Sequence, residues 1–118
     1  TKKKYYALCR SEIDEQGVFN FDLKHPDGHM QEAHTQYQRL ATNGDYSLVD
    51  ITIKTGRMHQ IRRHFSRRMF NLIGDSKYGQ GKVNKIFKDK YRFYRIFLHA
   101  FLFLRQLFQK SSILFFFL

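Results

Sequence analysis

Hydrophobic and polar residues alternate along the first part of the chain, a pattern typical of half-buried β-strands. Two segments, residues 4–9 and 18–23, each place three apolar side chains on one face. These are Tyr5, Ala7 and Cys9 in the first segment and Phe19, Phe21 and Leu23 in the second. The run Asp14-Glu15-Gln16-Gly17 predicts a turn between the two strands, and His25-Pro26-Asp27-Gly28 predicts a turn after them.

A longer hairpin is predicted next. Residues 33–41 and 46–54 are both β-like, and Asn43-Gly44-Asp45 lies between them. An Asn-Gly step between two such runs is a strong short-range signal for a β-hairpin. On the second arm Val49, Ile51 and Ile53 share a face, so we expect that face to contribute to the core.

After residue 54 the hydrophobic period changes from that of a strand to that of a helix. The apolar residues fall at helical spacing, at Met58, Ile61, Phe65 and Met69. Thr55 is a plausible N-cap, with Gly56 beside it. Arg62, Arg63 and Arg67 point away from this apolar stripe, so the pattern predicts an antiparallel hairpin that leads into an arginine-rich helix.

The rest of the chain has weaker patterns. Leu72-Ile73 is a short apolar step that ends at Gly74-Asp75, and residues 76–92 are basic, polar and loop-like. Residues 95–104 fit a strand or a short helix equally well, because periodicity alone does not separate the two. Residues 113–118 are a bare apolar run, and we treat residues 105–118 as a divergent tail.

Charge is distributed unevenly along the 118 residues. The net charge is +11, but residues 1–56 carry 7 basic and 8 acidic side chains, whereas residues 57–95 carry 12 basic and 2 acidic ones. A clustered basic patch of this kind indicates a polyanionic partner. Residues 57–74 contain no acid at all, although ordinary solvated faces mix both signs, and this favours nucleic-acid binding.

The single cysteine, Cys9, excludes an internal disulfide framework and a cysteine-rich zinc module, and it is compatible with the cytoplasm. We expect it to be a buried small hydrophobe. The chain starts without Met and without an apolar leader, so it is expected to begin within a longer protein. No stretch has the roughly 20 apolar residues of a membrane helix, and no membrane partner is expected.

Other chemistry finds little support. His25, His29 and His34 lie near Asp27 and Glu32, but their spacing fits no defined ligand pattern, so no metal is expected. No phosphate-binding glycine loop and no nucleophile elbow occur, so no cofactor is expected. Asp75 could be catalytic, but a turn or capping role is favoured. Tyr5 and Tyr6 follow three lysines, which leaves base stacking and an edge-strand role equally open.

Five segments resemble the RluA-type pseudouridine synthase family. Thr55-Gly-Arg-Met-His-Gln-Ile-Arg-Arg-His64 resembles its T-G-R-x-H-Q-[IL]-R-x-H signature. Four more segments occur in the family's order and resemble K-x-Y-x-A, A-x-T-x-Y, I-G-D-x-x-Y/H-G and R-x-x-L-H-A: residues 3–7, 33–37, 73–79 and 95–100. The resemblance covers about residues 2–104. The doubled Arg62-Arg63 and Asn84 look closest to the tRNA pseudouridine synthase C branch.

The resemblance implies an α+β pseudouridine synthase fold, here partial, with a mostly antiparallel mixed sheet and flanking helices. It implies isomerisation of uridine to pseudouridine in RNA, with tRNA favoured over ribosomal RNA, no DNA, no metal and no organic cofactor. It further implies that Tyr5 lies against the uracil and assists proton removal from C5, and that Arg62 pairs with the catalytic aspartate. The expected RNA-binding residues are Arg57, His59, Arg63, Arg67, Arg68, Lys77, Lys82 and Lys85.

The sequence also departs from the family pattern. The family's nucleophilic aspartate belongs to an H-R-L-D motif ahead of the K-x-Y-x-A strand, and no H-R-L-D occurs in the 118 residues. Phe70-Asn71 stands where the family usually has His-Pro. We therefore expect residues 1–104 to be the second portion of a catalytic domain, which binds RNA weakly and is inactive alone. The alternatives are a non-catalytic RNA-binding module on the same scaffold and, less favoured, a DNA-binding helix domain.

Overall fold

The computed structural model describes residues 3–91 and 98–100. The expected tail at residues 105–118 lies outside the described residues. In chain order the elements are β1 (Lys3–Arg10), β2 (Gln16–Phe19), β3 (Leu23–Lys24), β4 (Met30–Gln31), β5 (Thr35–Thr42), β6 (Tyr46–Ile53), α1 (Gln60–Arg67), α2 (Gly81–Tyr91) and β7 (Leu98–Ala100). Neither described helix is long and apolar enough to cross a membrane.

Five of the strands form one sheet in the order β2-β5-β6-β1-β7, and every described strand pair is antiparallel. The predicted β5–β6 hairpin is present, with Gly44 in the positive-φ conformation at its turn. β1 pairs with β6 over its full length, and Tyr5 lies opposite Ile51 on one side and Ala100 of β7 on the other. Residues 98–100 are therefore strand rather than helix.

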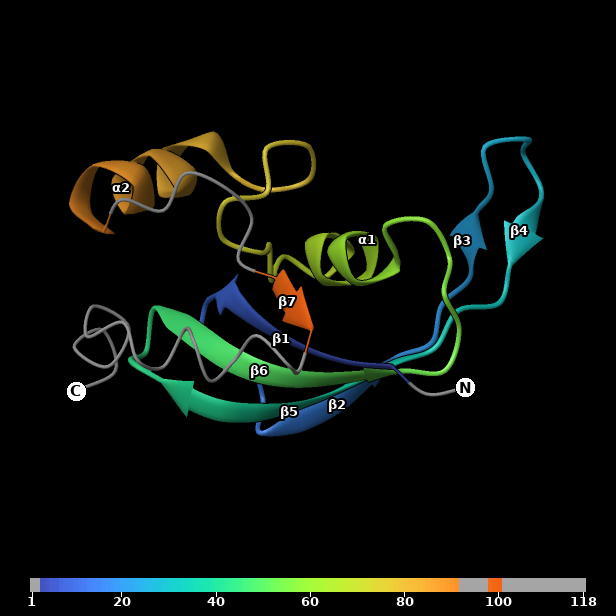
Figure 1. Ribbon diagram of the computed structural model, residues 1–118, viewed down its shortest axis with the longest axis horizontal. Helices are drawn as coiled ribbons and strands as arrows, with labels where there is room; N and C mark the ends of the chain where they lie inside the picture. Colours follow the sequence, from blue (N-terminus) through green and yellow to red (C-terminus); the bar gives the residue numbers. More distant parts are fainter. Residues whose placement is uncertain (1–2, 92–97, 101–118) are drawn as a thin grey trace.

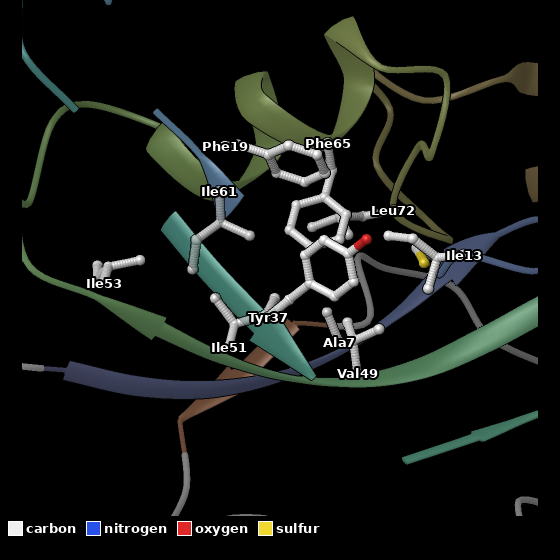
Figure 2. Packing of buried hydrophobic residues seen from close by; sticks show 11 residues of the cluster. Ala7, Ile13, Phe19, Tyr37, Val49, Ile51, Ile53, Ile61, Phe65 and Leu72 are labelled. Carbon is white, nitrogen blue, oxygen red and sulfur yellow. The ribbon is translucent and has the colours of Figure 1, made fainter. Parts of the chain in front are cut away.

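The core lies between one face of this sheet and α1. Figure 2 shows Ile61 and Phe65 of α1 pointing toward Val49, Ile51 and the other apolar side chains of the sheet. Phe65 is fully buried, and its ring meets that of Phe19 edge to face at 5.0 Å. Such aromatic pairs add to the stability gained from area burial alone. The strand-period face of β6 and the helix-period face of α1 thus bury each other.

Cys9 belongs to this core, as expected. It is free and fully buried, and burial raises the pKa of its thiol to about 12 despite hydrogen bonds from the backbone that act in the opposite direction. The thiol is therefore protonated and unreactive at neutral pH.

Three local expectations were wrong. Residues 18–23 do not form one strand, because the chain leaves the large sheet after Phe19 and Leu23 begins a separate two-stranded sheet of β3 and β4. Figure 1 shows this small sheet projecting beyond the main one. The predicted turn at residues 14–17 ends earlier, since Gln16 and Gly17 already pair with β5. Residues 81–91, expected to be loop, form α2.

The N-terminus of α1 also differs from the expectation. Its N-cap is His59, in the left-handed conformation and without a side-chain cap, and Thr55 lies farther upstream. Met58 and Met69, the outer members of the predicted stripe, are outside the helix and exposed. Thr55 instead accepts a hydrogen bond from the His34 amide and donates one to Gln60 Oε1, so it joins two segments rather than capping a helix.

Candidate active site

A cavity of about 250 Å³ lies where the start of β1 meets the loop before α1. Both residues expected to be catalytic, Tyr5 and Arg62, line it, together with two of the expected RNA-binding residues, Arg57 and His59. The remaining lining residues are Lys3, Ile53, Gly56, Gln60 and Ile61. A larger hollow of about 430 Å³ lies elsewhere, around Lys4, Gln38 and Asp50, and contains neither expected catalytic residue.

Arg62 is held by a two-point ion pair with Asp75. Its Nε donates to Oδ2 at 2.9 Å and its Nη2 donates to Oδ1 at 2.8 Å. The side chain of Asp75 is 1% exposed and that of Arg62 is 22% exposed. Burial alone would raise the pKa of Asp75, but the Arg62 guanidinium and two backbone amides outweigh burial and lower it. The carboxylate is therefore ionised at neutral pH.

Asp75 also organises the turn that follows it. Its Oδ1 accepts hydrogen bonds from the amides of Lys77 and Tyr78, both at 3.0 Å. The capping role expected from sequence is therefore present, and the ion pair with Arg62 was not foreseen. The turn is closed at Gly79, where a Cβ atom would lie 2.2 Å from the Asp75 carbonyl oxygen. The Asn84 side chain also stabilises the turn, because its Nδ2 donates a hydrogen bond to that same oxygen.

Tyr78 projects from this turn against two side chains of the cavity wall. The Arg62 guanidinium carbon lies 5.1 Å from its ring centre, a cation–π distance. Its hydroxyl is 3.1 Å from His59 Nδ1, and the two rings meet edge to face. Burial and the neighbouring cations, Arg62 first among them, lower the pKa of His59. The imidazole is therefore neutral at pH 7.

The opposite side of α1 carries a buried polar network. Gln60 Nε2 donates to the His34 carbonyl and to Thr35 Oγ1, each at 2.9 Å. Thr35 Oγ1 is also 2.8 Å from His64 Nδ1, and His64 Nε2 is 2.9 Å from the Phe21 carbonyl. Because that carbonyl can only accept, His64 Nε2 carries the proton, and Thr35 donates to Nδ1. The signature residues Gln60 and His64 therefore join α1 to β5 and to the chain before β3.

The expected RNA-binding arginines fall into two groups. Arg57 donates to the Glu32 carbonyl, and Arg63 donates to the carbonyls of Met58 and Lys24, so both join the small β3–β4 sheet to the loop before α1. Arg67 and Arg68 are exposed, and their guanidinium carbons lie 5.4 and 4.7 Å from the Phe21 ring centre. Lys77, Lys82 and Lys85 are exposed on the turn after Asp75 and on α2.

The histidines considered as metal ligands come together only in part. His25, Asp27 and His29 place one ligand atom each within 4.8 Å of the others, at the exposed turn between β3 and β4. Hydrogen bonds within the turn account for this arrangement. The Asp27 amide donates to His25 Nδ1, and Asp27 Oδ1 accepts from the His29 amide and contacts its ring.

Sequence reasoning missed Tyr78 as a member of the site. The sequence pattern predicts a turn or capping role for Asp75, but it gives Tyr78 no role and connects neither residue to Arg62. The spacing does contain a signal, because a carboxylate that caps the amide three residues later holds that residue in a turn. It does not reveal that the turn packs beside α1.

Comparisons with known proteins identify the family of this chain. The family model described as RNA pseudouridylate synthase matches residues 1–67. Two curated relatives named tRNA pseudouridine synthase C, from Vibrio parahaemolyticus and Haemophilus ducreyi, are each 34% identical over 84% of this chain. This region makes up 49% of each relative, so the chain spans about half the length of the curated relatives it matches.

Solved structures show the same fold. Human RNA pseudouridylate synthase domain containing 1 superposes with a TM-score of 0.70 at 24% identity, over 85% of this chain and 47% of its own. Human RNA pseudouridylate synthase domain containing 4 gives a TM-score of 0.67 at 27% identity, over 84% and 51%. With a family model that matches more than half of its residues, the chain belongs to the RNA pseudouridylate synthase family.

Proposed function

We propose that this chain forms part of an enzyme that isomerises uridine to pseudouridine in RNA, with tRNA favoured over ribosomal RNA as the substrate. The observation that carries the proposal is the cavity in which Tyr5 and Arg62 meet, although 57 positions separate them in sequence. The relatives named tRNA pseudouridine synthase C support tRNA as the substrate. An RNA-modifying enzyme of this kind would act in the cytoplasm.

The reaction breaks the bond between the ribose C1′ and uracil N1, turns the base, and joins C1′ to C5. The proton lost from C5 is matched by one gained at N1, so no oxidant, reductant or cofactor is needed. Tyr5 would lie against the uracil and assist removal of the C5 proton. Arg62 would hold an attacking carboxylate in its ionised form, because an opposed charge favours ionisation in a partly buried site.

Arg62 has the geometry to hold a second carboxylate. Its Nε and Nη2 bind Asp75, while Nη1 has no partner among the residues that the structure describes. Asp75 itself is a poor nucleophile, because its oxygens already accept from Arg62, Lys77 and Tyr78. None of the described residues that line the cavity carries a carboxylate. We propose that the nucleophile comes from an H-R-L-D segment outside these 118 residues, and that residues 1–104 are one part of a catalytic domain.

The proposed RNA surface consists of basic side chains from α1, from the turn after Asp75 and from α2. Arg67, Arg68, Lys77, Lys82 and Lys85 are exposed and would contact phosphates. Arg57 and Arg63 have a second role in joining the β3–β4 sheet to α1, and His59 belongs to the cavity wall. The target base must leave its stack to reach such a cavity. We propose single-stranded or looped RNA rather than DNA as the ligand.

Tritium release from tRNA that contains 5-tritiated uridine tests the proposal. The 118-residue chain alone is expected to bind tRNA weakly and to release no tritium. A chimera that places it behind the first half of the Vibrio parahaemolyticus relative is expected to release tritium. Tyr5→Phe and Arg62→Lys in that chimera should lower release at least a hundredfold, since each removes a group that acts in the reaction. Turnover by the chain alone would contradict the missing nucleophile.

A non-catalytic RNA-binding module is the second candidate, and the cavity without a carboxylate among its described lining residues favours it. The two candidates differ in the chimera. A folded, tRNA-binding chimera that releases no tritium would support the binding module and would contradict the proposed isomerase.

A further inference from the structure

We infer that Tyr78 is a positioning residue of this cavity, whose hydroxyl fixes the proton of His59 on Nε2 and whose ring covers one face of Arg62. This inference rests on the proposed function only for its effect on RNA, because the contacts themselves exist without a ligand. It gives the I-G-D-x-x-Y-G segment a defined task beside the signature helix α1.

Tyr78 is itself firmly held. Its amide donates to Asp75 Oδ1 at 3.0 Å. Its carbonyl accepts from Ser66 Oγ at 2.9 Å and from Asn71 Nδ2 at 2.8 Å. The backbone of Tyr78 is thus joined to α1 and to the segment after it, and its ring stays between Arg62 and His59. A side chain fixed in this way can orient its neighbours.

His59 needs such an orienting contact. It adopts the left-handed conformation with φ 51° and ψ 34°, which costs free energy for a residue other than glycine and favours a functional reason for the conformation. The conformation places the imidazole in the cavity wall beside Tyr78 rather than on a face of α1. One ring nitrogen, Nδ1, meets the Tyr78 hydroxyl, which leaves Nε2 available to a bound ligand.

The charges around His59 bear on whether its ring is neutral or protonated. Arg62 and Arg63 of α1, Arg57 of the preceding loop, Lys3 of β1, and Lys77 and Asp75 of the turn surround His59. Burial and this mostly cationic setting lower the pKa of His59 and favour the neutral imidazole, in which one nitrogen is an acceptor. In the inferred arrangement the Tyr78 hydroxyl donates to Nδ1, because a phenol is a good donor and a weak acceptor, whereas the unprotonated nitrogen of a neutral imidazole is a strong acceptor. Nε2–H is then a donor suited to a carbonyl or phosphate oxygen of RNA.

Histidine NMR on the ¹³C,¹⁵N-labelled 118-residue chain tests this arrangement without any RNA. The His59 signals are assigned by their loss in His59→Gln. In the wild type we expect the Nε2–H tautomer at pH 7.5 and a pKa below that of an exposed histidine. In Tyr78→Phe we expect a mixture of tautomers and a higher pKa, since removing a donor to the neutral ring destabilises the neutral form.

Tyr5→Phe is the matched control, because it removes a tyrosine hydroxyl from the cavity that His59 lines, and no hydrogen bond joins Tyr5 to His59 among the described residues. Its His59 tautomer and pKa should equal those of the wild type. An Nδ1–H tautomer in the wild type would overturn the inference, and this holds even if Tyr78→Phe does not fold. Unchanged His59 signals in a folded Tyr78→Phe would overturn it as well.

Filter binding of tRNA separates this inference from the proposed function. If the chain binds tRNA, Tyr78→Phe should weaken binding about threefold to tenfold while the circular dichroism spectrum is unchanged. Absence of tRNA binding by the wild type would count against the proposed function, while the NMR result would still decide the role of Tyr78. Equal tRNA affinity of the wild type and Tyr78→Phe would contradict the link between His59 and RNA.

Discussion

The two sides of α1 use the same ten-residue signature in opposite ways. On the side that faces β5, Gln60 and His64 form a closed network in which their polar side-chain nitrogens and oxygens are bound to protein. On the side that faces the Asp75 turn, Arg62 and His59 each keep one nitrogen group without a described partner. The first arrangement holds the helix in place, whereas the second leaves hydrogen-bonding capacity for a ligand. A signature of fixed residues therefore mixes scaffold and site, and only the hydrogen-bond geometry separates them.

The largest effect on folding should come from the side of α1 that faces the Asp75 turn. Asp75→Asn removes the charge that compensates Arg62, and we expect unfolding free energy to fall by about 3 kcal/mol, the lower end of the range for a buried pair because Arg62 retains some solvent contact. Urea denaturation measures this change. Asp45→Asn, at an exposed hairpin turn, is the control and should change stability by less than about 0.5 kcal/mol. If Asp75→Asn loses as little stability as the control, the Arg62–Asp75 ion pair does not stabilise the fold.

The second-largest loss of stability should come from the closed network of Gln60 and His64. Gln60→Ala leaves the Thr55 hydroxyl and the Arg57 amide without their acceptor in a partly buried region and removes one of the two hydrogen bonds of Thr35, so we expect a loss of about 2 kcal/mol. Gln38→Ala, on an exposed position of β5, is the matched control. The two sides of α1 share no hydrogen-bond partner here, so Gln60→Ala and Asp75→Asn should be additive within about 0.5 kcal/mol. A larger coupling energy would mean that the two sides act as one unit.

The tight packing of the turn after Asp75 can be tested by adding a methyl group at Gly79. Gly79→Ala would place Cβ against the Asp75 carbonyl oxygen, and we expect a loss of about 1–2 kcal/mol, as for other overpacked sites. Gly81→Ala meets nothing within 4 Å and begins α2, so it should be neutral or slightly stabilising. Equal stability of the two variants, measured by thermal unfolding, would contradict a rigid turn.

Acid should weaken the two sides in different pH windows. Burial lowers the pKa of His64, so the unfolded chain takes up its proton first, and stability is lost as the pH falls below the unfolded value of about 6.5. The pKa of Asp75 is also lowered, by Arg62 and the turn amides against the effect of burial. Its contribution is present above the unfolded value of about 4 and is lost as the pH falls through the folded value. Urea midpoints from pH 8 to 2 should show both losses, and Asp75→Asn should lack only the more acidic one.

The smallest effect on folding, with a clear effect on RNA, is expected for the exposed arginines. Arg67→Ala should change unfolding free energy by less than about 0.5 kcal/mol. If Arg67 contacts one phosphate, the slope of log K against log salt should fall by about 0.7–0.9. Arg63→Ala should also destabilise the fold, because its guanidinium binds backbone carbonyls of Met58 and Lys24. An unchanged salt slope for Arg67→Ala would exclude it from the RNA surface.

Regular periodicity explains what the sequence could predict. β1, the β5–β6 hairpin and the apolar face of α1 each bury one side, so their patterns are clear. The strand expected at residues 18–23 is wrong because the chain leaves the large sheet after Phe19, although Phe19 and Phe21 both pack against His64. The expected N-cap at Thr55 is wrong because the helix begins after His59. His59 is left-handed and contacts Tyr78, which is 19 positions away in sequence. Only the family resemblance predicts that Tyr5 and Arg62 share a site. The sequence pattern predicts the turn that holds Tyr78 but not its position beside α1.

The buried thiol of Cys9 can report unfolding of the protein through its reaction with a thiol reagent. Cys9 is the sole cysteine of the 118 residues and is fully buried near the end of β1, where burial raises the pKa of its thiol to about 12. A thiol reagent at neutral pH should therefore modify the chain only when β1 leaves the sheet. The rate of labelling reports opening of the strand that carries Tyr5, in the native buffer and without an added probe.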